Sequence, residues 1–176
     1  MIILLIEKNR KDCAEMAIRN IRVLGDDILT KKSKEVKAIN NRTRALIDDM
    51  LETMYEAQVV GLAAPQVGVL KRICVIDITE DCSEPIVLIN PEIIFADGEQ
   101  TDEEGCLSVP GKVGKVTRAK HVIVKALNED MEEIEIEAED LLARALAHEI
   151  DHLDGKMYVE LAEGGIYEPK KEEEEE

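Results

Sequence analysis

Aromatic side chains are scarce in this sequence of 176 residues. There is no Trp, and Tyr and Phe together make up 2 % of the chain, at Tyr55, Phe95, Tyr158 and Tyr167. Proteins that hold single-stranded nucleic acids stack the bases on aromatic rings. Such a stacking platform is therefore not expected here.

Positive charge is also in short supply. The chain has 22 Lys and Arg against 39 Asp and Glu, which gives a net charge of −17. A surface of this sign repels the phosphates of nucleic acids and of anionic membranes. Stable nucleic-acid binding and membrane docking are therefore not expected.

Long apolar runs are missing as well. No run approaches the ~18 residues that cross a membrane. The apolar run at residues 2–6 is too short for the core of a secretory signal, and its basic residues come after it. The cysteines, Cys13, Cys74, Cys82 and Cys106, are therefore expected to be reduced, in a cytoplasmic protein.

The two ends of the chain differ in composition from the rest. The segment that begins at Met16 resembles the start of a protein chain. We therefore interpret residues 1–15 as an upstream extension or an expression leader. The five glutamates at residues 172–176 are typical of a disordered acidic tail, which we place at residues 166–176. Residues 16–165 then form one domain.

Two segments have the apolar spacing of helices. Residues 33–57 carry apolar side chains at steps of three and four, and Ser33 is in position to cap this amphipathic helix. A second, more apolar helix is predicted to begin with Asp140 as its cap and to stop at Gly155.

Strand-like segments lie between these two helices. Residues 72–78 and 86–89 are rich in Ile and Val, whereas residues 121–127 and 133–138 alternate apolar and polar side chains around a turn. Strands followed by one late apolar helix predict an α+β fold, with antiparallel sheets packed around that helix.

The late helix carries the sequence His-Glu-Ile-Asp-His. His148 and His152 are four residues apart, so they lie one turn apart on one face, where two imidazoles can bind one metal ion. Glu149 can reach a water molecule on that metal. Burying these groups on an apolar helix without a partner would be costly, so the motif predicts a metal site.

A catalytic metal site needs a third protein ligand, and the sequence offers several. An extended zincin pattern would place a histidine where Tyr158 stands, so that version fails. Glu160 and Glu163 follow close behind, and Cys106 lies upstream as a possible thiolate ligand. Cys106 could instead be a packing residue, or a nucleophile with His148 as its base.

Three segments together resemble the motifs of one known family. They are Gly-Leu-Ala-Ala-Pro-Gln at residues 61–66, Glu-Gly-Cys-Leu-Ser at residues 104–108 and His-Glu-x-x-His at residues 148–152. In this order they resemble the three motifs of peptide deformylases. The resemblance covers roughly residues 16–160, and it extends to residues 19–26, residues 109–111 and Arg118.

The resemblance implies a metal-dependent hydrolase that removes the formyl group from the N-terminal formyl-methionine of newly made proteins. It implies Cys106, His148 and His152 as the metal ligands and Glu149 as the acid and base. The metal of the family is usually Fe²⁺, with Zn²⁺, Ni²⁺ or Co²⁺ often found instead. The catalytic domain would then be residues 16–165.

Further roles follow from the same resemblance. Gln66 and the backbone N–H of Leu107 would stabilise the oxyanion, and Gly61 would contact the substrate backbone. The methionine side chain needs an apolar pocket, and we expect it among residues next to the motifs: Val60, Leu141 and Ala145. The partners are formylated nascent chains. We expect at most weak contact with the ribosome, because the chain is acidic and lacks the long C-terminal helix of some relatives.

The sequence departs from the family pattern at two positions. Val59 stands where the family has the first glycine of its Gly-x-Gly motif, and Val does not easily adopt a positive φ. Ala147 stands where a glutamine usually precedes the first histidine. We expect both to affect rate more than reaction type. The alternatives are a related metal-dependent amidase or peptidase with another substrate, or a catalytically silent metal-binding homologue.

Overall fold

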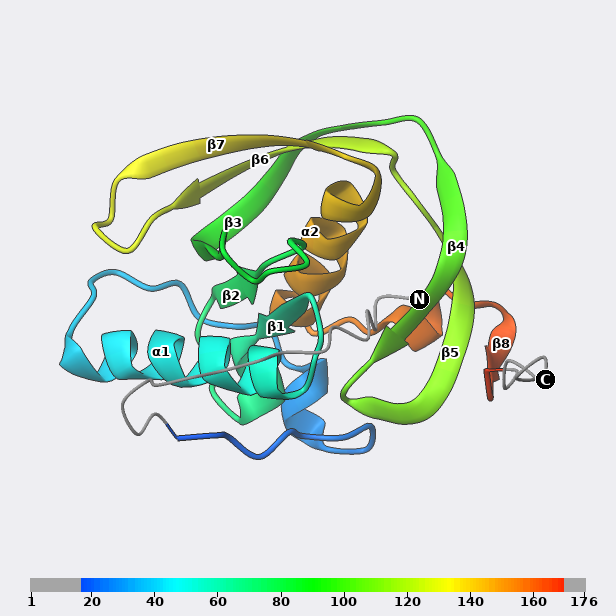
Figure 1. Ribbon diagram of the computed structural model, residues 1–176, viewed down its shortest axis with the longest axis horizontal. Coiled ribbons are helices and arrows are strands. Elements are labelled where there is room, and N and C mark those ends of the chain that lie inside the picture. The colour runs from blue at the N-terminus through cyan, green and yellow to red at the C-terminus, as the bar shows by residue number, and fades with distance from the viewer. Residues whose placement is uncertain (1–16, 170–176) are drawn as a thin grey trace.

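The computed structural model describes residues 17–169. Antiparallel sheets surround one central helix in this part of the chain, which confirms the predicted α+β class (Figure 1). No helix within residues 17–169 is long and apolar enough to span a membrane. The predicted extension at residues 1–15 and the glutamates at residues 172–176 lie outside the described residues.

The larger sheet has five strands in the order β1-β2-β3-β6-β7, and each neighbouring pair is antiparallel. The short strand β1, which begins at Gly61, forms one edge of this sheet. The bounds are β1 Gly61–Ala63, β2 Ile73–Ile76, β3 Ile86–Asp97, β6 His121–Leu127 and β7 Glu133–Glu139.

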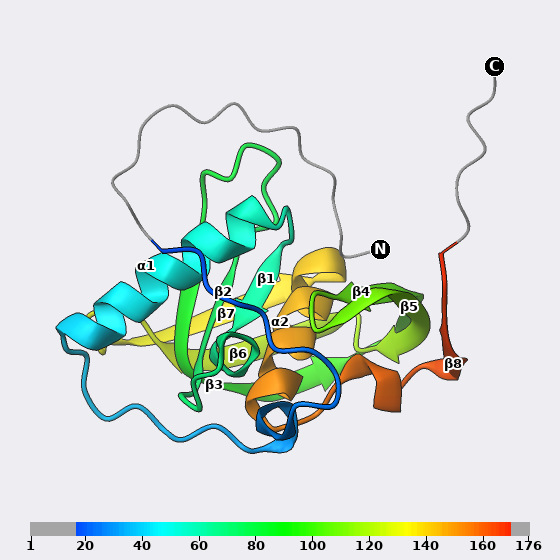
Figure 2. The ribbon, with the colours of Figure 1, turned by 90° about the horizontal axis from the view of Figure 1, so that it is seen from below.

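This sheet lies between helix α1 (Asn41–Glu56) and helix α2 (Asp140–Leu153) (Figure 2). In β2, Val75 belongs to the apolar cluster with side chains of α1, whereas Ile76 belongs to the cluster with side chains of α2. Successive side chains of a strand point to opposite faces, so a strand covered on both sides is apolar throughout. This explains the unbroken Ile and Val run that predicts β2.

The smaller sheet covers the other side of α2 (Figure 1). Its order is β4-β5-β8, with β4 at Gln100–Cys106, β5 at Val109–Arg118 and β8 at Glu163–Tyr167. An apolar cluster that includes Cys106 and Tyr158 joins this sheet to the short helix η3 (Tyr158–Glu160). The smaller sheet thereby brings the end of β4 up against α2.

The predicted boundary between domain and tail at residue 165 is wrong by two residues. Ile166 pairs with Gly114 of β5, and Tyr167 pairs with Val113. Backbone pairing at the edge of a sheet needs no apolar alternation, and the strand sequence Glu-Gly-Gly-Ile-Tyr carries none.

The start predicted for the first helix is also wrong. Helix α1 begins at Asn41, and its cap is Asn40, whose side chain accepts a hydrogen bond from the backbone N–H of Thr43 at 3.0 Å. Ser33 is buried in the preceding loop, where its N–H donates to the carbonyl of Leu153 at 2.8 Å. Apolar residues at helical spacing thus continue beyond the helix, because the loop packs its own side chains into the core.

The second helix begins and ends close to the predicted positions. Asp140 is its first residue rather than its cap, and Glu139 takes the cap position without a side-chain hydrogen bond. Gly155 follows the helix with a φ of 73°, a conformation that glycine adopts readily. Helix α2 therefore stops where its glycine predicts.

Candidate active site

His148 and His152 face one another one turn apart on α2, with ring centroids 5.0 Å apart. The end of β4 brings Cys106 to them, with its Sγ 3.3 Å from Nε2 of His152. One donor atom from each residue lies within 4.8 Å of the others, and the three residues are buried. The structure thus brings together the candidate ligands from two distant segments.

The donor chemistry of this cluster fits a divalent transition metal, because one thiol and two imidazoles suit Zn²⁺ and Fe²⁺. Nδ1 of His148 is hydrogen-bonded to Oε2 of Glu104 at 2.9 Å, which leaves Nε2 for the metal. A carboxylate on the far nitrogen orients metal-bound histidines in this way. Nδ1 of His152 is buried without a hydrogen-bond partner among the described residues, and its Nε2 faces Cys106.

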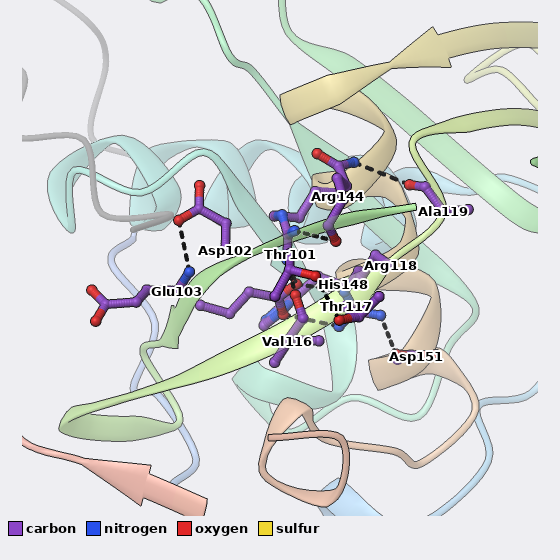
Figure 3. Close-up of polar contacts among 12 residues, drawn as sticks. Thr101, Asp102, Glu103, Val116, Thr117, Arg118, Ala119, Arg144, His148 and Asp151 are labelled. Carbon is purple, nitrogen blue, oxygen red and sulfur yellow. Dashed lines mark hydrogen bonds and ion pairs between the residues drawn. The ribbon is translucent and has the colours of Figure 1, made fainter. Parts of the chain in front are cut away.

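Glu104 of β4 lies at the centre of a buried network of charges that links β4 and β5 to α2. Arg118 donates two hydrogen bonds to it, at 2.5 and 2.9 Å, and Arg144 donates one at 2.6 Å. Arg118 also donates a hydrogen bond to Asp151 of α2 at 2.7 Å. Figure 3 shows Arg118, His148 and Asp151 together. The network fixes the side chain that orients His148, since its charges are buried and paired.

The network shifts the pKa values of its members. Burial alone would raise the pKa of Glu104, but the hydrogen bonds from His148 and Arg118 outweigh it and hold the pKa well below its usual range. Burial would lower the pKa of His148, but its contacts with Cys106 and Glu104 prevail and raise it to about 10. Burial lowers the pKa of His152 well below its ordinary value. The two imidazoles therefore differ in how strongly they hold a proton.

Glu149 lies against the backbone of β1. A Cβ atom on Gly61 would be only 2.5 Å from Oε1 of Glu149, so this approach requires glycine. Oε2 of Glu149 is buried without a hydrogen-bond partner among residues 17–169. Burial raises the pKa of Glu149 to about 7. A carboxyl group with such a pKa can both accept and return a proton near neutral pH.

Gln66 lies in the short helix η2 (Ala64–Val67) and is buried. Its Oε1 accepts a hydrogen bond from the N–H of Ala63 at 3.0 Å, which fixes the orientation of the amide. Its Nε2 is therefore directed to Sγ of Cys106 at 3.3 Å and to Oγ of Ser108 at 3.2 Å. The side chain offers a rigidly placed N–H donor beside the three candidate ligands.

Comparison with known proteins agrees with these observations. The family model for polypeptide deformylase matches residues 18–164. A peptide deformylase from Lachnoclostridium phytofermentans is 59 % identical, over 92 % of this chain and 99 % of its own length. Another from Agathobacter rectalis is 61 % identical, over 86 % and 94 % of the two chains. This chain belongs to the polypeptide deformylase family.

Solved deformylase structures share the fold. The crystal structure of a peptide deformylase from Legionella pneumophila superimposes with a TM-score of 0.81 at 50 % identity, over 84 % of this chain and 87 % of its own. The two proteins are therefore similar in sequence as well as in backbone structure. The two sheets and α2 therefore form the deformylase fold.

The deformylase site of this chain contains a small pocket, whose cavity of about 10 Å³ holds roughly one water molecule. Val59 and Leu107 supply its apolar wall. Val60 and Ala145 lie instead in the core cluster around α2, and Leu141 is half-buried in the first turn of that helix. The full lining is Val59, Gly61, Gln66, Gly105, Cys106, Leu107, His148 and Glu149.

The positive φ that valine does not easily adopt is not required of Val59. Among the described non-glycine residues of this loop, the positive φ belongs to Gln58, at 55°, and not to Val59. The β-branched side chain therefore sits on a backbone that suits it. Ala147 is half-buried on α2, between Leu146 and His148.

Sequence reasoning misses Glu104 and Arg144, which belong to the charge network beside the candidate ligands. Arg144 precedes His148 by four residues, so both lie on one face of α2, and its guanidinium also donates to the carbonyl of Val116 at 3.0 Å. An arginine on the apolar face of a predicted metal-binding helix is the signal that points to them, because a buried cation requires an anionic partner.

Proposed function

We propose that Cys106, His148 and His152 of this deformylase hold one divalent metal ion and that Glu149 carries the proton of the reaction. The chain is a metal-dependent hydrolase that removes the formyl group from N-terminal formyl-methionine and releases formate. The observation that carries the proposal is the buried cluster of one thiol and two imidazoles beside a carboxyl group whose pKa is about 7.

A bound divalent metal lowers the pKa of a water molecule and polarises a carbonyl group, which is the chemistry that formamide hydrolysis needs. Glu149, whose carboxyl group lies close against Gly61 at the edge of the pocket, accepts the proton of the attacking water. It then returns this proton to the leaving amine of methionine. A pKa near 7 serves both transfers at neutral pH.

Charge develops on the formyl oxygen during the attack, and we assign its stabilisation to Gln66 and to the backbone N–H of Leu107. The amide of Gln66 is suited to this role because Ala63 fixes its orientation and its Nε2 already points into the cluster. Leu107 lines the same pocket. Fixed donors of this kind cost little reorganisation when the charge forms.

We further propose Fe²⁺ as the metal in cells, with Zn²⁺, Ni²⁺ or Co²⁺ able to replace it in purified protein. A thiolate and two imidazoles accept each of these ions, so availability decides which is bound. The proposed compartment is the cytoplasm. The proposed role of Cys106 as a thiolate ligand is in keeping with it, because reduced thiols persist in that compartment.

The partners that we propose are formylated nascent chains, which this enzyme would reach by diffusion. With a net charge of −17, the chain should be repelled by ribosomal RNA and make at most weak contact with the ribosome.

The test compares two variants in formate release from a formyl-Met peptide and in metal content. Glu149→Gln should keep close to one equivalent of metal and lose at least ~10²-fold in turnover, the scale of lost acid–base catalysis. Cys106→Ala should lose the metal, whereas Cys82→Ala, at a half-buried position outside the cluster, should keep it. Near-normal turnover in Glu149→Gln, or full metal content in Cys106→Ala, would overturn the assigned roles.

A further inference from the structure

Residues 19–26 resemble the opening of the family, and the proposed chemistry gives them no role. We call this segment the strap. Figure 1 shows it in blue below α1, to which it is joined through Arg19. The guanidinium of Arg19 pairs with Asp49 at 2.8 Å, and its backbone N–H donates to Oγ1 of Thr53 at 2.9 Å. The strap then continues to η2 and to the turn between β4 and β5, which both contribute residues to the pocket.

Two backbone N–H groups of the strap donate to these two segments. The N–H of Arg22 donates to the carbonyl of Gln66 at 2.7 Å, and the N–H of Leu24 donates to the carbonyl of Ser108 at 2.7 Å. The two acceptor residues are joined to one another, because Nε2 of Gln66 donates to Oγ of Ser108 at 3.2 Å. Both are buried. The strap therefore holds each end of the hydrogen bond between Gln66 and Ser108.

This hydrogen bond determines where the amide of Gln66 points. A glutamine amide has two N–H donors on one nitrogen atom. Ser108 accepts from that nitrogen on one side, and Sγ of Cys106 lies 3.3 Å from it on the pocket side. The N–H that we assign to the oxyanion thus keeps its direction only while Ser108 stays in place. An error of about 1 Å in such a placement can cost roughly 10²-fold in rate.

We propose that the strap is a positioning element for the reaction, in which the backbone N–H of Leu24 fixes Ser108 and thereby the amide of Gln66. Leu24 touches neither the candidate ligands nor Glu149 through any hydrogen bond of the described residues, so it acts through Gln66. The proposal rests on the proposed function, because it needs Gln66 to act on the formyl oxygen.

The local backbone allows this one N–H to be removed cleanly. The N–H of Asp26 donates to the carbonyl of Val23 at 3.0 Å, and Gly25 has a φ of 105°. These are the features of a type II turn with Leu24 at its second position, where proline is common because its fixed φ fits. Leu24→Pro should therefore keep the turn and lose only the donor to Ser108.

The experiment measures kcat and KM for formate release from a formyl-Met peptide, together with metal content. Leu24→Pro should lower kcat by about tenfold, less than the ~10²-fold of a deleted oxyanion donor, because Gln66 is displaced rather than removed. KM and metal content should stay at their wild-type values, since the donor acts on charge that forms only in the transition state. An ester bond in place of the amide between Val23 and Leu24 removes the same N–H and should give the same loss. It also decides the question if the proline variant does not fold.

Two controls separate the N–H from other effects of the substitution. Leu24→Ala keeps the N–H and shortens a side chain that is 51 % exposed, so it should keep the wild-type kcat. Glu129→Pro places a proline at the second position of the turn from Asn128 to Met131, where the N–H of Met131 donates to the carbonyl of Asn128 at 3.0 Å. This turn joins β6 to β7 and contributes nothing to the pocket, so kcat should again be unchanged.

A variant of Gln66 shows whether Leu24 acts through that amide. Gln66→Met removes both N–H donors and keeps a side chain of similar length. In this background Leu24→Pro should lower kcat further by about twofold at most, because no amide is left to position. Such non-additivity is expected only of residues that act on one another.

The outcomes separate this inference from the proposed function. An unchanged kcat in both the Leu24→Pro and the ester variant would overturn the role of the strap. Losses of equal size in the wild-type and Gln66→Met backgrounds, or a higher KM at unchanged kcat, would overturn it as well. If the wild type releases no formate from any formylated peptide, the proposed function itself fails.

Discussion

At the scale of single residues, Glu104 connects the stability of the domain to its chemistry. The side chain is fully buried, and its carboxylate forms ion pairs with Arg118, Arg144 and His148. Burying a charge is favourable only when its partners are fixed and well oriented. The same contacts therefore hold β4 and β5 on α2 and set the orientation of one candidate metal ligand.

Replacing this carboxylate should affect folding and metal binding together. Glu104→Gln should lower the free energy of unfolding by about 3–5 kcal/mol, because it leaves buried arginine charge without its anion. It should also weaken metal binding by about 10–100-fold, since the support of His148 is lost. Thermal unfolding and metal titration measure the two effects.

Glu135→Gln provides the control, because Glu135 is an exposed acid on β7. It removes the same charge and should change neither quantity noticeably. Equal effects of the two substitutions would show that net charge, rather than the network, is responsible.

The residues that we propose for the chemistry can be found in the sequence because their types are unusual at their positions. Two histidines and a glutamate at helical spacing on an apolar helix indicate a metal site on their own. Sequence spacing alone does not show whether Cys106, Glu160 or Glu163 is the third candidate ligand. The fold determines this, because the end of β4 places Cys106 next to the two histidines. The motif resemblance supplies that choice.

At the scale of elements, helix α1 shows how a cap decides where a helix starts. Apolar residues at helical spacing begin near Ser33, but the backbone turns helical only after Asn40, whose side chain accepts hydrogen bonds from the N–H and hydroxyl groups of Thr43. Apolar residues at helical spacing indicate which side chains are buried, whereas the N-cap residue indicates where the helix begins.

Loss of this cap should be measurable. Asn40→Ala should destabilise the protein by about 0.5–2 kcal/mol in chemical denaturation, the range for lost N-caps. Asn41→Ala serves as the comparison, because Asn41 is the exposed first residue of the helix and does not occupy the cap position. If Asn41→Ala costs as much as Asn40→Ala, the cap is not the cause.

The strands that could be predicted differ physically from those that could not. Strands β6 and β7 alternate apolar and polar side chains because one face packs on the core, and the predicted bounds of β6 match the observed ones. Strand β4 has the sequence Gln-Thr-Asp-Glu-Glu-Gly-Cys, which carries no such pattern. It forms through pairing with β5 and through the charges beneath it, both of which are tertiary interactions.

At the scale of the whole molecule, charge is the dominant feature. A net charge of −17 on 176 residues should keep the protein away from polyanions, while the proposed chemistry uses the small pocket beside Glu149. The charged surface and the pocket are therefore expected to act independently of one another.

Removal of residues 170–176 tests this independence. The shortened chain should turn over short formyl-Met peptides at nearly the rate of the full chain, because the pocket is built from residues 59–149. Binding of the full chain to empty ribosomes should be weak in a sedimentation or fluorescence titration. Salt-sensitive binding at sub-micromolar concentration, or a large loss of peptide turnover on truncation, would contradict the expectation.

The proposed deformylation is tested most directly by identifying the products that the full chain forms from one formyl-Met peptide. The protein is loaded anaerobically with Fe²⁺, and formate and peptide are quantified together by enzymatic assay and mass spectrometry. We predict one formate for each otherwise intact peptide with a free amino terminus. Cleavage at an internal peptide bond would indicate an amidase or peptidase with another substrate, and the absence of any product from the metal-loaded protein would indicate a silent homologue; either result would contradict the proposed reaction.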